Sequence, residues 1–337
     1  MLNFGIIGAG RIGKVHAESI TFHVKNAKVA AMADPFMTSE TEKWATELGV
    51  AKCYKDYHDI LNDPSIDAVM ICSSTQTHAP ISIEAIQAGK HVFCEKPISQ
   101  DLTQIKEVVE ALSKSNVKYQ VGFNRRFDHN FRAVRAAVLD GKIGDVHIVK
   151  ITSRDPGAPP VEYVKVSGGM FLDMTIHDFD MVRYLTGSDV EEIYVNAAVL
   201  VDPAIGEAGD VDTAIISMKL KNGALAVIDN SRKAEYGYDQ RAEVFGSKGQ
   251  VQVTNDASST AVISNAEGVT GEKPLFFFLE RYMESFSREV SQFVDAVIND
   301  KEVPVTVNDG LQAVLIGVAA GKSLRENRPV KLTEINY

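Results

Sequence analysis

Apolar and polar positions follow two different rhythms along this chain, and the change falls after Gly122. Before it, short apolar runs separate segments in which apolar residues recur every three or four positions. Such runs are typical of buried strands, and such spacing is typical of amphipathic helices. The predicted strands are 2–7, 29–33, 67–72, 91–94 and 118–122, and the predicted helices are 11–22, 38–48, 76–88 and 101–115. This alternation predicts an α/β domain with a doubly wound parallel sheet.

After Gly122 the pattern predicts an α+β domain with one large, mostly antiparallel sheet. A Pro/Gly-rich loop begins at Asp155, and Asn222-Gly223 is a strong hairpin signal between two strands. The predicted strands are 144–153, 190–200, 211–221, 224–231 and 240–246, and the predicted helices are 128–140, a segment around 173–180, 278–299 and 309–326. We therefore expect two domains, residues 1–122 and 123–337.

Composition and charge exclude several classes of protein. The apolar runs are far shorter than the ~18 residues that cross a membrane, and the chain enters a strand-like run at Leu2 without a secretion signal. A net charge of −10 without a dense Lys/Arg cluster argues against nucleic-acid binding. The three cysteines suit reduced thiols better than a disulfide framework. We expect a cytoplasmic protein that binds neither membrane nor nucleic acid.

A glycine-rich motif joins the first predicted strand to the first predicted helix. Its residues are Gly8, Ala9, Gly10, Arg11, Ile12 and Gly13. Alone the pattern is weak, but the strand–turn–helix context is the one that a Rossmann dinucleotide site requires. The glycines permit a tight turn and close approach of a pyrophosphate, and the helix N-terminus supplies N–H donors. We predict that Gly8, Gly10, Arg11, Ile12 and Gly13 bind a dinucleotide; the alternative is a glycine-rich turn without a ligand.

The second predicted strand ends at Asp34, 21 residues after Gly13. A carboxylate at this point accepts hydrogen bonds from the adenosine ribose and repels a 2′-phosphate. Pro35 and Phe36 follow, with no arginine to hold such a phosphate. The pattern favours NAD over NADP.

Further candidates follow the third strand, at the carboxyl edge of the sheet where ligands of doubly wound folds bind. Ser73 and Ser74 are predicted to line the dinucleotide groove, although a serine here also suits the cap of the next helix. His78 is a candidate cofactor contact; a first-turn surface position is the alternative.

Glu95-Lys96-Pro97 ends the strand at 91–94 and lies at the same edge. An ammonium group beside a nicotinamide hydrogen-bonds a substrate hydroxyl and lowers its pKa. We predict that Glu95 and Lys96 contact the cofactor and that Lys96 is catalytic. An exposed Glu–Lys pair is the alternative.

In the segment Asp173-Met-Thr-Ile-His177-Asp-Phe-Asp180, helical spacing places Asp173, His177 and Asp180 on one face. Leu172, Ile176, Phe179 and Val182 form the neighbouring apolar stripe. The three polar residues suit an acid–base pair, a metal site, a buried structural pair or a solvated face. Because histidines are scattered and spacings such as H-E-x-x-H are absent, we expect no metal.

These motifs together with Gly-Phe-Asn-Arg-Arg-Phe (122–127) resemble the Gfo/Idh/MocA oxidoreductase family over essentially the whole chain. Residues 153–157, 168–180, 229–232 and 236–241 resemble its inositol 2-dehydrogenase branch. The resemblance implies catalytic roles for Lys96, Asp173 and His177. It also implies substrate contacts by Asn124, Arg125, Asp155 and Tyr236, with Arg125 near the nicotinamide as well.

Oxidation of a secondary alcohol needs a proton acceptor, and an imidazole with a pKa near 6.5 suits the task. We predict His177 as general base, with Lys96 and Asp173 as partners, in NAD-dependent oxidation of a cyclic polyol such as myo- or scyllo-inositol. Hydroxyl-pairing groups in the site favour such a substrate over an apolar alcohol. A glucose-type dehydrogenase of the same family and a non-catalytic NAD-binding regulator remain alternatives.

An apolar outer face of the second sheet would need a partner. The candidates for this face are Ala197, Val199, Val201, Ile216, Ala226 and Ile228. The resemblance implies oligomers formed through this sheet, and we expect a homo-oligomer, with a tetramer favoured.

Overall fold

The computed structural model describes residues 1–336, which divide into two compact units. The first comprises residues 1–127 and 283–314, and the second comprises 128–282 and 315–336. The predicted boundary at residue 122 lies close to the first change of unit. The return of the chain to the first unit at Met283 was not predicted. Within residues 1–336, no helix combines the length and the apolar character needed to cross a membrane.

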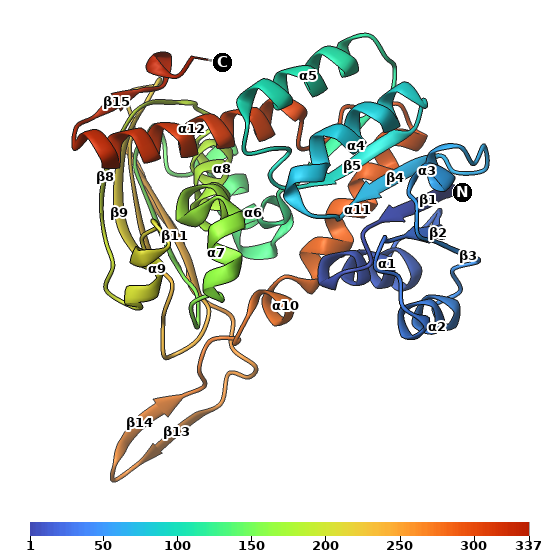
Figure 1. The fold of residues 1–337 in the computed structure, drawn as a ribbon. Coiled ribbons are helices and arrows are strands. Elements are labelled where there is room, and N and C mark those ends of the chain that lie inside the picture. Colours follow the sequence, from blue (N-terminus) through green and yellow to red (C-terminus); the bar gives the residue numbers. More distant parts are fainter. Residues whose placement is uncertain (337) are drawn as a thin grey trace. The chain divides into compact units, whose positions relative to one another are not determined.

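A six-stranded parallel sheet of order β3-β2-β1-β4-β5-β6 forms the centre of the first unit (Figure 1). Its strands are β1 (Leu2–Ile7), β2 (Ala27–Ala33), β3 (Lys52–Tyr54), β4 (Ala68–Ile71), β5 (His91–Glu95) and β6 (Tyr119–Gly122). The helices between them are α1 (Arg11–His23), α2 (Ser39–Glu47), α3 (His58–Leu61), α4 (Thr75–Gln87) and α5 (Leu102–Ser113). The doubly wound fold is confirmed. Strand β3 and helix α3 were missed because three or four residues show no clear period.

Helix α11 (Met283–Ile298) completes the core of the first unit. Its residues Val290, Phe293 and Val294 are buried in the same core cluster as Phe4 and Phe93. The Phe293 ring centroid lies 6.0 Å from that of Phe4 and 5.8 Å from that of Phe93. Sequence periodicity predicts such a helix but not its partner, since Phe293 lies 289 residues after Phe4 and 200 residues after Phe93.

In the second unit, a seven-stranded sheet has the order β12-β11-β7-β10-β9-β8-β15 (Figure 1). Its strands are β7 (Val146–Arg154), β8 (Val190–Ala198), β9 (Thr213–Leu220), β10 (Leu225–Ser231), β11 (Asp239–Gly246), β12 (Gly249–Val253) and β15 (Val330–Lys331). Strands β7 and β10 run parallel, and the other neighbours are antiparallel. The mostly antiparallel sheet and the Asn222-Gly223 hairpin are confirmed, with Gly223 at φ 89°.

Helices cover one face of this sheet, and α8 packs against β7 and β10. The remaining elements are η1 (Asn124–Phe127, first unit), α6 (His129–Leu139), α7 (Val161–Ser167), η2 (Met170–Met174), α8 (Thr175–Thr186), α9 (Pro203–Glu207), the β13 (Val262–Asn265)–β14 (Gly268–Gly271) hairpin, α10 (Phe278–Arg281), α12 (Val307–Glu326) and η3 (Leu332–Glu334). Ile176, Phe179 and Val182 are fully buried, which confirms most of the predicted stripe.

The prediction for the outer face of the sheet was partly wrong. Ile216, Ala226 and Ile228 point inward and are at most 3% exposed. Their neighbours Ile215 and Leu225 are instead 57% and 49% exposed. Successive side chains of a strand face opposite sides, so an error of one residue in assigning the face exchanges the inner and outer sets.

Candidate active site

The glycine loop after β1 has the shape that a dinucleotide requires. Gly8 adopts φ +103°, and a Cβ there would lie 2.6 Å from the Cys72 backbone; a Cβ on Gly13 would lie 2.0 Å from the Gly8 carbonyl oxygen. A Cβ on Gly10 would meet no described atom within 4 Å. Gly8 and Gly13 are therefore needed for packing, whereas Gly10 leaves open space at the start of α1. This space, the exposed Arg11 and the partly buried Ile12 beside it fit a bound pyrophosphate.

Asp34 lies directly after β2 and binds back to this loop. Its Oδ2 accepts a hydrogen bond from the Ala9 backbone N–H at 2.7 Å, and its Oδ1 accepts one from the Phe36 N–H at 2.8 Å. The carboxylate is thereby held beside the glycine loop, in the position from which it would reach an adenosine ribose.

Ser73, Ser74 and His78 gather at the end of β4. The Ser73 hydroxyl pairs with the Thr77 hydroxyl at 2.6 Å. Ser74 occupies the N-cap position of α4, but its side chain makes no capping bond to the described residues, so capping is not the reason for a serine there. Both hydroxyl residues remain candidates for the dinucleotide groove.

The imidazole of His78 is buried, so the surface alternative is wrong. Its Nδ1 lies 2.8 Å from the Pro97 carbonyl oxygen and its Nε2 lies 3.0 Å from the Ser73 carbonyl oxygen. Only an imidazolium donates from both nitrogens. Burial lowers the pKa of His78, but the Cys94 sulfur and these two carbonyl oxygens outweigh it and raise the pKa to about 9. His78 ties the Ser73 turn to the Lys96-Pro97 segment.

The end of β5 carries Glu95 and Lys96. Glu95 Oε1 lies 2.6 Å from His16 Nε2, and Glu95 Oε2 accepts a 3.3 Å hydrogen bond from the Lys96 backbone N–H. A Cβ on Gly122 of β6 would lie 3.1 Å from this carboxylate, which explains a glycine at that point. Lys96 follows at the carboxyl edge of the sheet, as the motif predicts.

Asn124 and Arg125 lie in η1 directly after β6. They are 5% and 4% exposed, and the Asn124 amide donates a 3.5 Å hydrogen bond to the Ser285 hydroxyl on α11. The short 3-10 helix therefore holds both residues in the first unit, the one that carries the glycine loop.

The helix that carries Asp173 and His177 is not continuous, which corrects the prediction of three polar residues on one regular face. Residues Met170–Met174 form a π turn, and α8 begins at Thr175. Gly169 adopts φ 71°, and a Cβ there would lie 2.7 Å from Asp210. The Asp210 carboxylate accepts hydrogen bonds from the Met170 N–H at 3.0 and 3.1 Å. The π turn changes the direction in which Asp173 projects relative to α8.

Asp173 belongs to a charged group in the second unit that we call the Arg232 cluster: Tyr163, Asp155, Asp173 and Arg232. The Tyr163 hydroxyl donates to Asp173 Oδ1 at 2.9 Å, and Arg232 Nη1 donates to Asp173 Oδ2 at 3.3 Å. Arg232 Nη1 also lies 3.7 Å from Asp155 Oδ2. The arginine side chain is 3% exposed, so its charge compensates both carboxylates away from bulk water.

The predicted site contained Asp155 and Asp173 but neither Tyr163 nor Arg232. Arg232 lies in one of the stretches that resemble the inositol 2-dehydrogenase branch, and this was its one signal in the sequence. Its Nε and Nη2 are buried without a hydrogen-bond partner among residues 1–336. Such donors are costly unless a ligand or ordered water meets them.

His177 and Asp180 both lie in α8, and Asp180 is only 1% exposed, which excludes the solvated-face alternative for it. Asp178, which was not predicted as a site residue, is fully buried. Its Oδ2 accepts a 3.0 Å hydrogen bond from Asn230, which in turn accepts one from the Thr175 hydroxyl at 2.6 Å. This network fixes the start of α8 on β10 and thereby positions His177.

Tyr236 makes its hydrogen bonds outside both the Arg232 cluster and the Asp178–Asn230 network. Its hydroxyl donates to Asp239 Oδ2 at 2.5 Å and accepts a hydrogen bond from Arg154 Nη1 at 3.1 Å. The side chain is 41% exposed. Burial and the Asp239 carboxylate raise the pKa of Tyr236. A direct contact between Tyr236 and a substrate stays a prediction.

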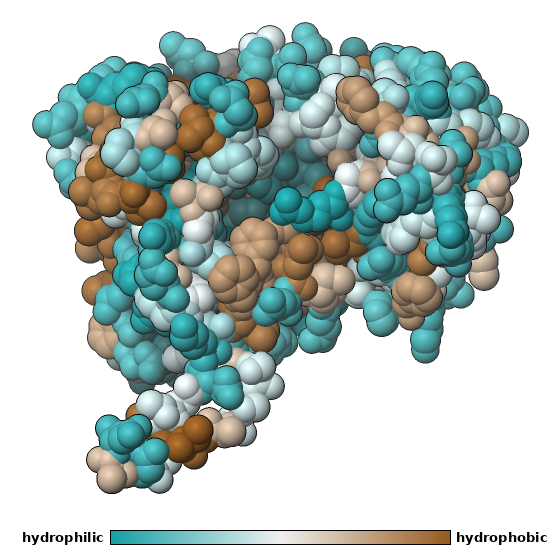
Figure 2. Space-filling view, turned by 60° about the horizontal axis from the view of Figure 1, so that its bottom comes forward, coloured by the Kyte–Doolittle hydropathy of each residue, from teal (hydrophilic) through white to brown (hydrophobic). Residues whose placement is uncertain are grey.

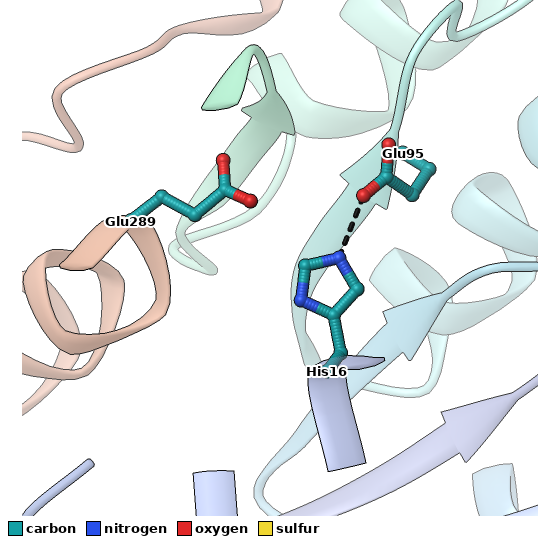
Figure 3. A group of neighbouring side chains, drawn as sticks. All are labelled: His16, Glu95 and Glu289. Atoms are coloured by element: carbon teal, nitrogen blue, oxygen red, sulfur yellow. Dashed lines mark hydrogen bonds and ion pairs between the residues drawn. The ribbon is translucent and has the colours of Figure 1, made fainter. Parts of the chain in front are cut away.

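One group of titratable side chains within residues 1–336 has the composition of a metal site: His16, Glu95 and Glu289 in the first unit (Figure 3). One ligand atom from each lies within 4.8 Å of the others, and all three residues are buried. No local motif indicates this group, because its members come from α1, β5 and α11.

Comparison with known proteins identifies the family. Residues 2–123 match the NAD-binding Rossmann domain of an oxidoreductase family model, GFO_IDH_MocA, and residues 135–332 match its C-terminal alpha/beta domain. The chain belongs to the Gfo/Idh/MocA family of NAD-binding oxidoreductases, as the motifs predict.

Individual relatives are similar over their whole length. The chain is 48% identical to a myo-inositol 2-dehydrogenase of Thermotoga maritima and 44% identical to an inositol 2-dehydrogenase of Rhizobium meliloti, covering 98–99% of this chain and 99% of each relative. It also resembles the crystal structure of a Lactobacillus casei scyllo-inositol dehydrogenase with bound NAD(H) and scyllo-inositol. That similarity has a TM-score of 0.91 at 32% identity and covers 99% of both chains.

Proposed function

We propose that the protein is an inositol 2-dehydrogenase, which oxidises one hydroxyl of a cyclic polyol to a ketone with NAD. Full-length similarity to inositol dehydrogenases supports this function. The observation in the molecule that carries it is the Arg232 cluster, where one buried arginine holds two carboxylates and a tyrosine hydroxyl meets one of them. Such groups pair hydroxyls and are stranded by a substrate that lacks them.

The cofactor residues fit NAD. We assign the glycine loop to the pyrophosphate and Asp34 to the adenosine ribose, where a carboxylate opposes a 2′-phosphate. Ser73, Ser74 and Arg125 are assigned to the remainder of the dinucleotide, and His78 and Glu95 to holding the Ser73 turn and the Lys96 segment. Bound NAD supplies the hydride acceptor.

We assign the proton chemistry to three side chains, His177, Lys96 and Asp173. We assign His177 as the base that accepts the proton of the reacting hydroxyl, since a neutral imidazole suits proton transfer near neutral pH. Lys96 donates a hydrogen bond to the same oxygen and stabilises its developing negative charge. Asp173 accepts a hydrogen bond from a neighbouring hydroxyl and favours the imidazolium. Asn124, Arg125, Asp155 and Tyr236 are assigned to the other hydroxyls.

Initial rates with separate inositol isomers, each with NAD and with NADP, test this function. With NAD, we expect NADH to form from myo- or scyllo-inositol. With NADP, we expect little oxidation of either inositol. Faster turnover of glucose than of every inositol would favour a sugar dehydrogenase. Tight NAD binding without turnover of any polyol would favour a regulator.

The outer face of the second sheet supports a homo-oligomer, and we propose a cytoplasmic tetramer. Ile148, Tyr194 and Leu225 line a shallow groove on this face, and Ile215 and Phe245 are exposed. Figure 2 shows apolar side chains along the left edge of the view, where Figure 1 places β8 and β9. Light scattering at micromolar concentration should give a tetramer that Leu225→Asp weakens; a monomer in the wild type would contradict the proposal.

A further inference from the structure

Glu289 stands on the apolar face of α11, where a charged side chain is unexpected. Its neighbours Phe286, Val290 and Phe293 are buried, and Glu289 itself is 0% exposed. Neither carboxyl oxygen has a hydrogen-bond partner among residues 1–336. A glutamate almost never occupies such a position unless another group compensates it.

The carboxyl group of Glu289 points toward the His16–Glu95 pair (Figure 3). His16, on α1, is 0% exposed, and aromatic rings confine it: its centroid lies 5.3 Å from that of Phe93 and 5.6 Å from that of Phe286. Its Nδ1 has no partner within the described residues. The three side chains therefore share one enclosed polar space inside the first unit.

Two kinds of positive charge suit this space, a proton or a cation. The 2.6 Å separation of His16 Nε2 and Glu95 Oε1 is a hydrogen-bond distance. Two ligands of one zinc ion, each about 2.1 Å from it, would lie about 3.4 Å apart in tetrahedral geometry. The Glu289 oxygen, up to 4.8 Å from its partners, suits a bridging water better than a direct bond. The distances favour a proton.

The charge balance agrees with this choice. Glu95 already pairs with His16, so an ionised Glu289 would need a separate compensating charge in the same enclosed space. Within residues 1–336, two other groups interact with Glu289, and neither is positively charged. They are the Cys72 thiol at the end of β4 and the Gln120 amide on β6, which donates to the Glu289 backbone oxygen at 3.1 Å. Burial and the charge of Glu95 raise the pKa of Glu289 well above its usual range.

We propose that Glu289 is a neutral carboxylic acid at working pH and a positioning residue for the active site. As a neutral acid it adds no charge beside the Glu95 carboxyl group, whose Oε2 accepts the hydrogen bond from the Lys96 N–H. Ionisation of Glu289 would place a second negative charge beside Glu95 and disturb the end of β5. The effect on turnover rests on the role proposed for Lys96, whereas the protonation of Glu289 does not.

Unfolding equilibria from pH 5 to pH 9 test the protonation directly. A carboxyl group whose pKa is raised by folding keeps a proton that the unfolded chain releases above about pH 4.5, so stability falls as pH rises toward the folded pKa. The unfolding constant of the wild type should therefore rise about tenfold more per pH unit than that of Glu289→Gln. Glu284→Gln, on the exposed side of the same helix, should show the same pH dependence of the unfolding constant as the wild type. Equal pH dependence in all three proteins would overturn the proposal.

Two further measurements complete the test. The infrared C=O band of a protonated carboxylic acid should be present in the wild type at pH 8 and absent from Glu289→Gln; its absence from the wild type overturns the proposal even where the variant fails to fold. Metal analysis should find less than stoichiometric divalent cation. One ion per wild-type chain, lost in Glu289→Gln, would assign the space to a metal instead.

Turnover tests the positioning role. Glu289→Leu should lower kcat about tenfold, while Glu289→Gln, which keeps a neutral donor, should restore it and retain more of its kcat than the wild type above pH 9. Wild-type kcat in Glu289→Leu would overturn the positioning role and leave the protonation to be judged by the stability data.

Discussion

The glycine loop and the Arg232 cluster, the two regions that we propose to bind polar ligands, are built in different ways. In the first unit, backbone geometry makes the site: Gly8 and Gly13 permit close packing, and Gly10 leaves space at a helix N-terminus. In the second unit, side-chain charge makes it: Arg232 holds Asp155 and Asp173 in place. A backbone site leaves a local motif in the sequence, whereas a charge cluster joins distant residues. The two regions should therefore respond differently to mutation.

The largest effect should come from Lys96. Lys96→Ala removes the hydrogen bond proposed to stabilise the reacting oxygen, and we expect kcat to fall by about 10²–10⁴-fold. NAD affinity, measured by titration of protein fluorescence, should change little because the glycine loop is intact. Lys106→Ala, on the exposed side of α5, is the matched control. Loss of NAD binding with normal kcat in the remaining holoenzyme would make Lys96 a cofactor residue only.

Arg232 should give the next largest effect, confined to the polyol side. Arg232→Leu leaves two carboxylates without their buried counter-charge, and we expect a loss of about 3–5 kcal/mol in stability. The KM for inositol should rise at least tenfold with the KM for NAD unchanged. Arg232→Lys should recover part of both losses. Denaturant titration and steady-state kinetics measure them, and an equal rise in both KM values would contradict the separation of the two regions.

Asp34 should affect the cofactor in the way that Arg232 affects the polyol. Asp34→Ser removes the carboxylate that opposes a 2′-phosphate, and the preference for NAD over NADP in kcat/KM should fall by about tenfold or more, equivalent to roughly 1.4 kcal/mol. The KM for inositol should not change. An unchanged cofactor preference would show that another group selects NAD.

The smallest effect should be the pH response of His78. Its folded pKa of about 9 lies above the ordinary value of 6.5, so its stabilising contribution is complete below pH 6.5 and disappears as the pH rises through 9. The melting temperature should fall by several degrees more in the wild type than in His78→Gln between pH 7 and pH 10. Parallel melting curves would show that the buried ring is neutral throughout.

Much of the fold could be predicted from periodicity, because the helix and strand patterns of apolar residues extend over long segments. The strand at 2–7 and the alternation up to Gly122 are reproduced by the structure. The short elements β3, α3, α7 and α9 lack enough residues to show a period. The hidden face of the second sheet was misassigned at Ile216, since a strand with apolar residues on both faces does not reveal which side is covered.

The site divides in the same way. Gly8, Asp34 and Lys96 were predicted because each has a fixed place relative to a strand end. Tyr163 and Arg232 were not, because their importance depends on the π turn that aims Asp173 and on the return of the chain after β10. Glu289 was predicted only as part of the helix at 278–299, because no local sequence pattern indicates that it lies near Glu95.

In the reaction that we propose, His177 accepts the proton while the Arg232 cluster holds the polyol. The most direct test is the pH dependence of kcat/KM for inositol in the wild type and in His177→Ala at saturating NAD. We expect the wild type to lose activity at acid pH, where an imidazole is protonated, and the variant to be about 10²–10⁴-fold slower without that limb. A His177→Ala protein with normal turnover and an unaltered pH profile would exclude His177 as the proton acceptor.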